Sequence, residues 1–101
     1  MDKQSLSVSM VGMVWYAPEH FAEVKAMMED GHKLHATYAE WQVAAENGER
    51  HMRSKGGRVV RALLVPAAFR EFCSARGLKL NADARNQFAN TVAIEEYRNG
   101  G

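Results

Sequence analysis

Residues 56–69, GGRVVRALLVPAAF, form the stretch that decides the fold. The Gly56-Gly57 pair predicts the end of a helix, because glycine accepts the left-handed conformation that closes many helical C-termini. Residues 58–65 are rich in β-branched and aliphatic side chains and predict a strand. Pro66 then occupies the favoured first position of a new helix. This order of helix, strand and helix indicates a domain of mixed α and β structure.

The same signals occur earlier in the chain. Residues 7–16 alternate between apolar and polar and then become an apolar run, which predicts the first strand. Gly12 in its middle indicates a bulge or a close backbone neighbour. Pro18 predicts a helix that continues to about Asp30, and Gly31 is expected to end it as a left-handed stop.

A second helix is expected between this stop and the decisive stretch. Thr37 and Glu40 have the spacing of a capping box, which predicts its start. An apolar stripe then recurs at spacings of three and four residues, so we extend the helix to about Lys55. The alternative is a break at Gly48, since glycine costs about 1 kcal/mol in a helix interior.

The C-terminal part predicts two more helices. The helix that begins at Pro66 should bury Phe69, Phe72 and Cys73 and end at Gly77. Asn81 or Asp83 should cap a fourth helix that runs to about Tyr97. Its inward positions are Ala84, Phe88, Ala89, Val92 and Ala93. Residues 1–6 and 98–101 are expected to fray.

The two halves of the chain follow one plan: a strand, a helix that begins with proline, a glycine stop and a capped helix. We therefore predict one α+β domain, residues 1–101, with the order β-α-α-β-α-α. Two interpretations of the likeness stay open: a tandem βαα repeat about a pseudo-twofold axis, and chance similarity of the two halves. Two strands alone make a poor sheet. We expect the four helices to cover one face, and the open strand edges to pair across a homodimer.

Composition supports a small globular protein. The chain is 47% hydrophobic and 25% charged, which argues against disorder beyond its ends. Residues 1–49 carry eight acids and three bases, net −5, whereas residues 50–101 carry ten bases and four acids, net +6. An apolar run over residues 10–17 is too short to span a membrane, and no basic leader precedes it. A lone cysteine fits a reducing compartment, so we expect a cytoplasmic protein.

Residues 34–89 resemble a group of small, uncharacterised bacterial proteins. The matching motifs are L-x-x-T-[YF]-x-E-W from Leu34, A-E-x-G, V-V-R, a proline-led F-x-x-[WF]-C and A-R-x-x-F-A. Ala67 departs from the pattern, since those proteins often carry an acidic residue after the second strand. The resemblance implies a shared fold and a bacterial source. The group has no assigned activity, so no functional residue is implied.

Basic residues concentrate near the decisive stretch. A nucleic-acid or anion site there would use Arg50, Arg53, Lys55 and Arg58, with Arg85 and Asn86 of the fourth helix as a second contact. The simpler interpretation is a solvated helix end, because cations near a helix C-terminus complement its dipole. Arg58 and Arg61 lie on opposite faces of a strand, so the charges form no single patch by periodicity.

Other side chains that could bind a ligand or a metal, or take part in catalysis, are scattered along the chain. A ligand pocket or enzyme site would gather Trp15, His35, Tyr38 and Trp41, although such aromatic residues are more often core. His32 and His35 make half of a metal site, so we expect no metal and no cofactor. Cys73 should be an inert core thiol, and Glu29-Asp30 a solvated pair. No phosphate loop, dinucleotide fingerprint or nucleophile motif occurs in the sequence.

Taken together, these features favour association over catalysis. We expect a cytoplasmic bacterial domain that forms a homodimer or binds a protein partner, and no membrane. Nucleic-acid binding is the first alternative, and a small-ligand pocket or enzyme near Trp15, His35 and Trp41 is the second.

Overall fold

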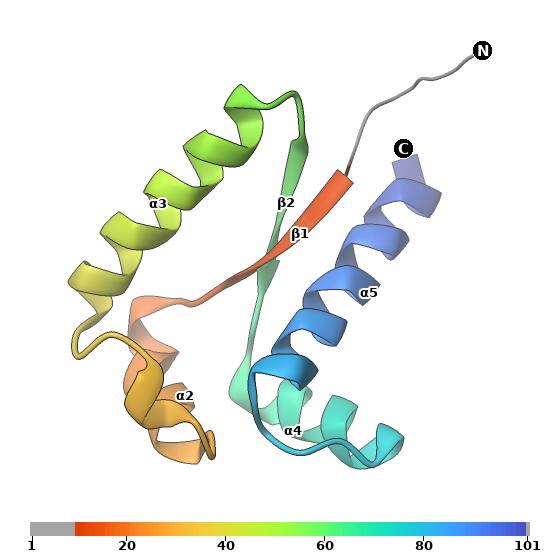
Figure 1. Cartoon of the computed structure of the whole chain (residues 1–101). Helices are drawn as coiled ribbons and strands as arrows, with labels where there is room; N and C mark the ends of the chain where they lie inside the picture. Colours follow the sequence, from red (N-terminus) through yellow and green to blue (C-terminus); the bar gives the residue numbers. More distant parts are fainter. Residues whose placement is uncertain (1–9, 101) are drawn as a thin grey trace.

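The computed structural model describes residues 10–100 of the 101-residue chain. The elements in chain order are β1 (Met10–Trp15), a 3-10 turn η1 (Pro18–His20), α2 (Phe21–Met27), a second 3-10 turn η2 (Gly31–Lys33), α3 (Tyr38–Ser54), β2 (Arg58–Leu63), α4 (Pro66–Arg76) and α5 (Ala82–Gly100). This order confirms the α+β prediction of β-α-α-β-α-α (Figure 1).

β1 and β2 form a two-stranded parallel sheet in which Met10 lies opposite Arg58 and Trp15 opposite Leu63. Both strands end earlier than predicted, because the chain leaves β1 after Trp15 and β2 after Leu63. Residues 7–9 of the predicted first strand lie outside the described part of the chain. A parallel pair needs a long crossover, and here α2 and α3 supply it.

The helices pack on both faces of this sheet, so the prediction of one covered face is wrong (Figure 1). Gly12 lies against Ala89 of α5, whereas its neighbour Met13 reaches Gly48 of α3. Neighbouring strand residues point to opposite faces, so α5 and α3 lie on opposite sides. Each half's long helix packs chiefly on the other half's strand, α3 on β2 and α5 on β1.

The first helical segment is shorter than predicted. Pro18 does begin it, but as a 3-10 turn, and α2 ends when Met28 becomes extended, with φ −80° and ψ 139°. Gly31 is not a left-handed stop, because only Gly56 and Gly77 have positive φ among the described glycines. A Cβ at Gly31 would lie 1.9 Å from the Lys25 carbonyl oxygen. Gly31 therefore permits a close backbone approach.

Several local signals act as predicted. The Thr37 hydroxyl accepts a hydrogen bond from the Glu40 N–H at 3.1 Å, and α3 continues through Gly48 without a break. Gly77 ends α4 in the left-handed conformation with φ 65°. Asn81 is the residue that caps α5, because its side-chain oxygen accepts the Ala84 N–H at 3.1 Å. α5 continues to Gly100, three residues beyond the predicted end.

The core is aromatic at its centre and lined with alanines along α5. Trp15, Tyr16, Phe21 and Trp41 are buried together, and their rings meet edge-on or tilted. On α5 the buried side chains are Ala84, Ala89 and Ala93. Small side chains let α5 approach β1 so closely that Gly12 has room for no Cβ.

Within residues 10–100, no helix combines the length and apolar character that crossing a bilayer requires.

Candidate association surface

The outer edges of the sheet carry backbone groups that no described residue pairs. The Leu64 N–H donates to the Trp15 carbonyl oxygen at 2.8 Å, so the backbone groups of Trp15 point towards β2. Backbone groups alternate in direction along a strand, so those of Val11, Met13 and Trp15 point towards β2. Those of Met10, Gly12 and Val14 point to the outer edge of β1. Within residues 10–100, β1 has β2 as its strand partner and no third strand joins the sheet.

The two edges differ in charge. β1, MVGMVW, contains no charged residue, whereas β2, RVVRAL, contains Arg58 and Arg61. Charged side chains are a common means by which proteins prevent edge-to-edge pairing. β2 has this protection and β1 does not.

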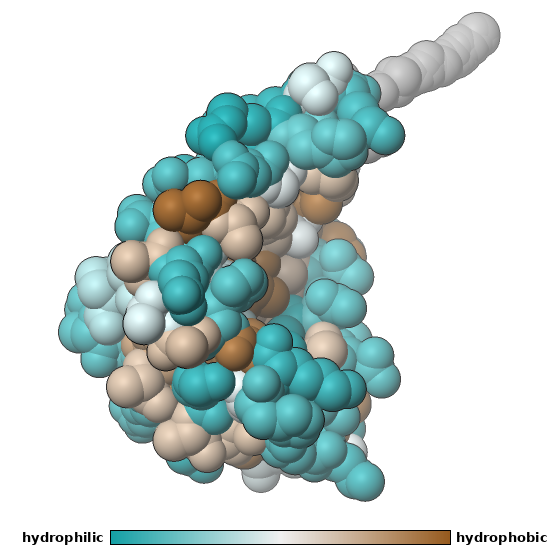
Figure 2. All heavy atoms as spheres, turned by 60° about the vertical axis from the view of Figure 1, so that its left-hand side comes forward, coloured by the Kyte–Doolittle hydropathy of each residue, from teal (hydrophilic) through white to brown (hydrophobic). Residues whose placement is uncertain are grey.

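β1 is also incompletely buried for an apolar parallel strand. Met10, Val11, Gly12, Met13 and Val14 are all half-buried, and burial is complete only at Trp15. Strands of parallel sheets are normally buried on both faces. The helix that lies over β1 adds further exposed apolar area, since Ile94 is 51% and Tyr97 67% exposed on α5. Apolar atoms also reach the surface on the α3 side, between hydrophilic side chains (Figure 2).

A buried ion pair ties α3 to β2. Glu49 is only 3% exposed, and its two carboxylate oxygens each accept a 2.8 Å hydrogen bond from Arg61. The Arg61 guanidinium lies 3.9 Å from the centre of the Trp15 ring, and Arg53 approaches Glu49 at 3.2 Å. The hydrogen bonds from Arg61 hold the pKa of Glu49 below its usual range, although burial acts in the opposite direction. This cluster fixes the helix on the sheet.

The sequence interpretation missed Glu49 as a buried residue. Glu49 follows Trp41 and Ala45 at intervals of four, so it shares their inward face. That spacing was the available signal.

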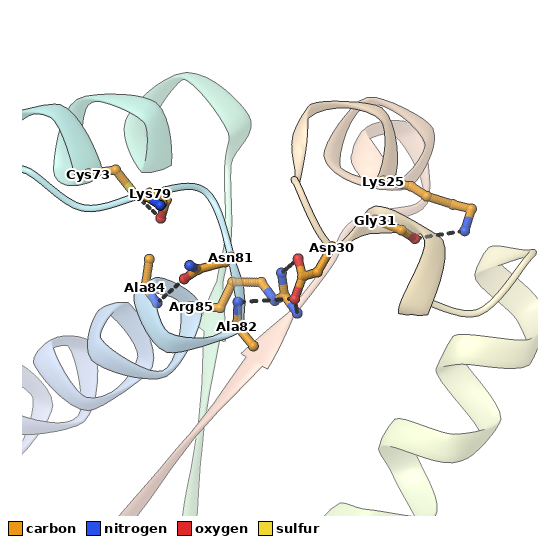
Figure 3. A network of polar contacts seen from close by, with 9 residues as sticks. All are labelled: Lys25, Asp30, Gly31, Cys73, Lys79, Asn81, Ala82, Ala84 and Arg85. Atoms are coloured by element: carbon orange, nitrogen blue, oxygen red, sulfur yellow. Dashed lines mark hydrogen bonds and ion pairs between the residues drawn. The ribbon is translucent and has the colours of Figure 1, made fainter.

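A second ion pair joins the α2–η2 loop to the start of α5 (Figure 3). Arg85 donates to both oxygens of Asp30, at 2.8 and 3.1 Å, and the Ala82 N–H donates to the same carboxylate at 3.1 Å. The hydrogen bonds from Arg85 hold the pKa of Asp30 below its usual range. The expectation of a solvated Glu29-Asp30 pair is therefore wrong for Asp30.

The basic candidates do not form one patch. Arg50 donates to the Asn47 side chain, Arg53 pairs with Glu49, and Lys55 lies exposed at the end of α3, just before Arg58 begins β2. Arg85 and Asn86 lie at the start of α5, at the opposite end of the molecule (Figure 1). Arg85 is committed to Asp30, with 12% of its side chain exposed. The second contact of the nucleic-acid hypothesis is therefore remote from the first.

The aromatic candidates belong mostly to the core. Trp15 and Trp41 are buried, with ring centres 5.1 Å apart, and Tyr38 packs on Trp41 at 5.4 Å. His35 is exposed in the loop before α3. The structure thus brings three of the four residues together by packing, and the two tryptophans line no cavity wall.

An open groove lies nearby, between α2 and the loop that leads into α3. Its volume is about 720 Å³, and its lining is Pro18, Phe21, Ala22, Lys25, Ala26, Gly31, His32, Ala36, Thr37 and Tyr38. Lys25 joins the two walls, because its ammonium donates to the carbonyls of Gly31 and Leu34 at 2.9 and 3.1 Å. Of the predicted ligand-pocket residues, only Tyr38 lines it.

The single cysteine of the chain lies in the core. Cys73 is buried, and burial raises the pKa of its thiol, as expected for a core cysteine. Within residues 10–100, no three histidine, cysteine or acidic side chains converge as metal ligands would.

Comparison with protein-family models, with curated proteins and with solved structures found no match for this chain.

Proposed function

We propose that this protein is a cytoplasmic association domain whose first partner is a second copy of itself. The observation that carries the proposal is the two-stranded sheet, whose apolar β1 is half-buried and whose outer edges have no strand partner among the described residues. Two strands are fewer than most sheets contain. Pairing between copies would supply the missing strands and bury the exposed apolar area.

The charge distribution supports the same proposal. The first half of the chain is net −5 and the second half net +6. Two copies related by a twofold axis can place the acidic half of one beside the basic half of the other, which favours association over repulsion. The internal pairing of Arg53 and Arg85 leaves the nucleic-acid alternative with less support.

The test is the mass of the full-length protein in solution, measured by sedimentation equilibrium from low micromolar to millimolar concentration. The proposal expects twice the mass of one chain at the higher concentrations and dissociation on dilution. A single-chain mass at every concentration would refute self-association.

A further inference from the structure

We infer that the second copy binds along the outer edge of β1, antiparallel, with the twofold axis at Gly12. This inference rests on the proposed self-association and adds where and in which register the copies meet. The result would be a four-stranded sheet in the order β2-β1-β1-β2.

The side chains and backbone groups at the outer edges of β1 and β2 indicate which edge the second copy binds. An antiparallel neighbour at β1 meets apolar side chains and the backbone groups of Met10, Gly12 and Val14, for which residues 10–100 offer no partner. A neighbour at β2 would instead place Arg61 opposite Arg61 of the second copy, because Arg61 is the outward-pointing centre of that edge. Like charges placed opposite each other on a sheet are destabilising. The β1 edge is therefore the favoured one.

The helix over β1 supports this choice. Phe88 of α5 packs on Phe69 and Phe72 of α4, at ring distances of 5.7 and 5.5 Å. Tyr97 follows Phe88 by two and a half helical turns, so it lies on the opposite side of α5, with Ile94 one turn before it. Both are more than half exposed. They add exposed apolar surface on the helix that packs on β1.

The register follows from the direction of the backbone groups. In an antiparallel pair, two opposed residues exchange two hydrogen bonds when the backbone N–H and C=O groups of each point towards the other strand. An axis at Gly12 places Gly12 opposite its own copy and Met10 opposite Val14 of the second copy. All three outward-pointing residues of each β1 are then paired. Val11 lies opposite Met13 of the second copy as a non-hydrogen-bonded pair.

This register makes a specific prediction for disulfide formation. Non-hydrogen-bonded partners have Cα atoms about 4.5 Å apart, within the range that a disulfide spans. Diagonal neighbours lie about 7–8 Å apart, at or beyond the limit. A mixture of Val11→Cys and Met13→Cys chains should cross-link under mild oxidation, and each variant alone should cross-link much less.

Two controls accompany the experiment. The parent chain carries only Cys73, which is buried and should form no covalent dimer. The matched mixture of Val60→Cys and Ala62→Cys chains probes the same geometry on the β2 edge. There the backbone groups of Arg61 point to the outer edge, as those of Gly12 do on β1, so a twofold axis would lie at Arg61. Each variant is first checked for parent-like circular dichroism, and Val59→Cys with Leu63→Cys, which are opposed in the same register, serves as a second β2 mixture if Ala62→Cys fails to fold.

The outcomes separate the two proposals. Cross-linking that is at least tenfold faster in the β1 mixture than in either β1 variant alone and in the β2 mixture supports the inference. Faster cross-linking in the β2 mixture overturns it. A dimeric mass without selective cross-linking at β1 also overturns it, while self-association itself stands. A single-chain mass at every concentration overturns both self-association and the β1 interface.

Discussion

At the scale of single residues, Glu49 shows how a charge can be buried in a small core. Its carboxylate is satisfied by two hydrogen bonds from Arg61, and Arg61 in turn lies over Trp15. The inward position of Glu49 could be predicted from its spacing with Trp41 and Ala45. Its partner could not be predicted, because either Arg58 or Arg61 could pair with Glu49 until it is known which face of β2 packs on α3.

Glu49→Gln should destabilise the protein. The substitution leaves Arg61 without its anionic partner, but about half of the Arg61 side chain is exposed and can be hydrated. We therefore expect a loss of about 1–3 kcal/mol in the free energy of unfolding, measured by urea denaturation. Glu29→Gln, at an exposed glutamate, is the control and should change it by less than about 0.5 kcal/mol. Equal effects of the two substitutions would contradict the role given to Glu49.

The two ion pairs also predict how stability depends on pH. Asp30 and Glu49 have lowered pKa values in the folded protein, whereas in the unfolded chain each titrates near its ordinary value of about 4. Below about pH 5 the unfolded chain therefore binds more protons than the folded one. The stabilisation is present above the unfolded pKa values and is lost as the pH falls through the folded ones.

The measurement is the urea midpoint from neutral pH to about pH 3, with the double variant Asp30→Asn, Glu49→Gln for comparison. The variant should be less stable at neutral pH and should lose less stability on acidification. An unchanged loss on acidification would show that other groups carry the acid dependence.

At the scale of elements, glycine has two different roles in this chain. Gly56 and Gly77 supply positive φ at helix ends, and the sequence context predicted this use correctly. Gly12 and Gly31 instead permit close backbone approach. For Gly12 the sequence left a bulge and a close neighbour open, and only the position of α5 decides between them. For Gly31 it indicated the wrong role, because a short 3-10 turn after a helix resembles a stop in sequence.

Gly12→Ala and Gly48→Ala should act in opposite directions. A Cβ at Gly12 would lie 2.1 Å from the Ala89 carbonyl oxygen, so β1 and α5 must separate, at a cost of about 1–3 kcal/mol. A Cβ at Gly48 would meet only the Met13 methyl group at 3.6 Å, an ordinary contact. Alanine in the interior of α3 should stabilise the protein by about 0.5–1 kcal/mol. Thermal unfolding of both variants tests this, and destabilisation by Gly48→Ala would contradict the ordinary contact found between Gly48 and Met13.

At the scale of the whole molecule, the element order could be predicted from sequence, but the layering could not. Strand, proline and glycine signals define the order locally. The face that each helix covers depends on the parallel pairing of β1 with β2, and no local signal in the chain encodes that pairing. For the same reason, the sequence does not show that Arg85 and Asn86 lie far from the end of α3.

A charge placed on β1 should weaken the dimer, whereas the same charge on β2 should not. Val11 and Val59 lie opposite each other in the intrachain ladder and are both half-buried, so they form a matched pair. Val11→Lys should raise the dimer dissociation constant at least about tenfold, equivalent to about 1.4 kcal/mol, because lysine protects strand edges from pairing. Sedimentation equilibrium measures both variants. A larger effect of Val59→Lys would place the interface at β2.

Residue-resolved amide hydrogen exchange over a range of protein concentrations tests the central claim most directly. The N–H groups of Gly12 and Val14 point away from β2, whereas those of Val11 and Met13 point towards it. The account expects Gly12 and Val14 to be protected at high concentration and to exchange faster on dilution, while Val11 and Met13 change less. Exchange at Gly12 and Val14 that is fast at every concentration, in a protein of dimeric mass, would contradict association through β1.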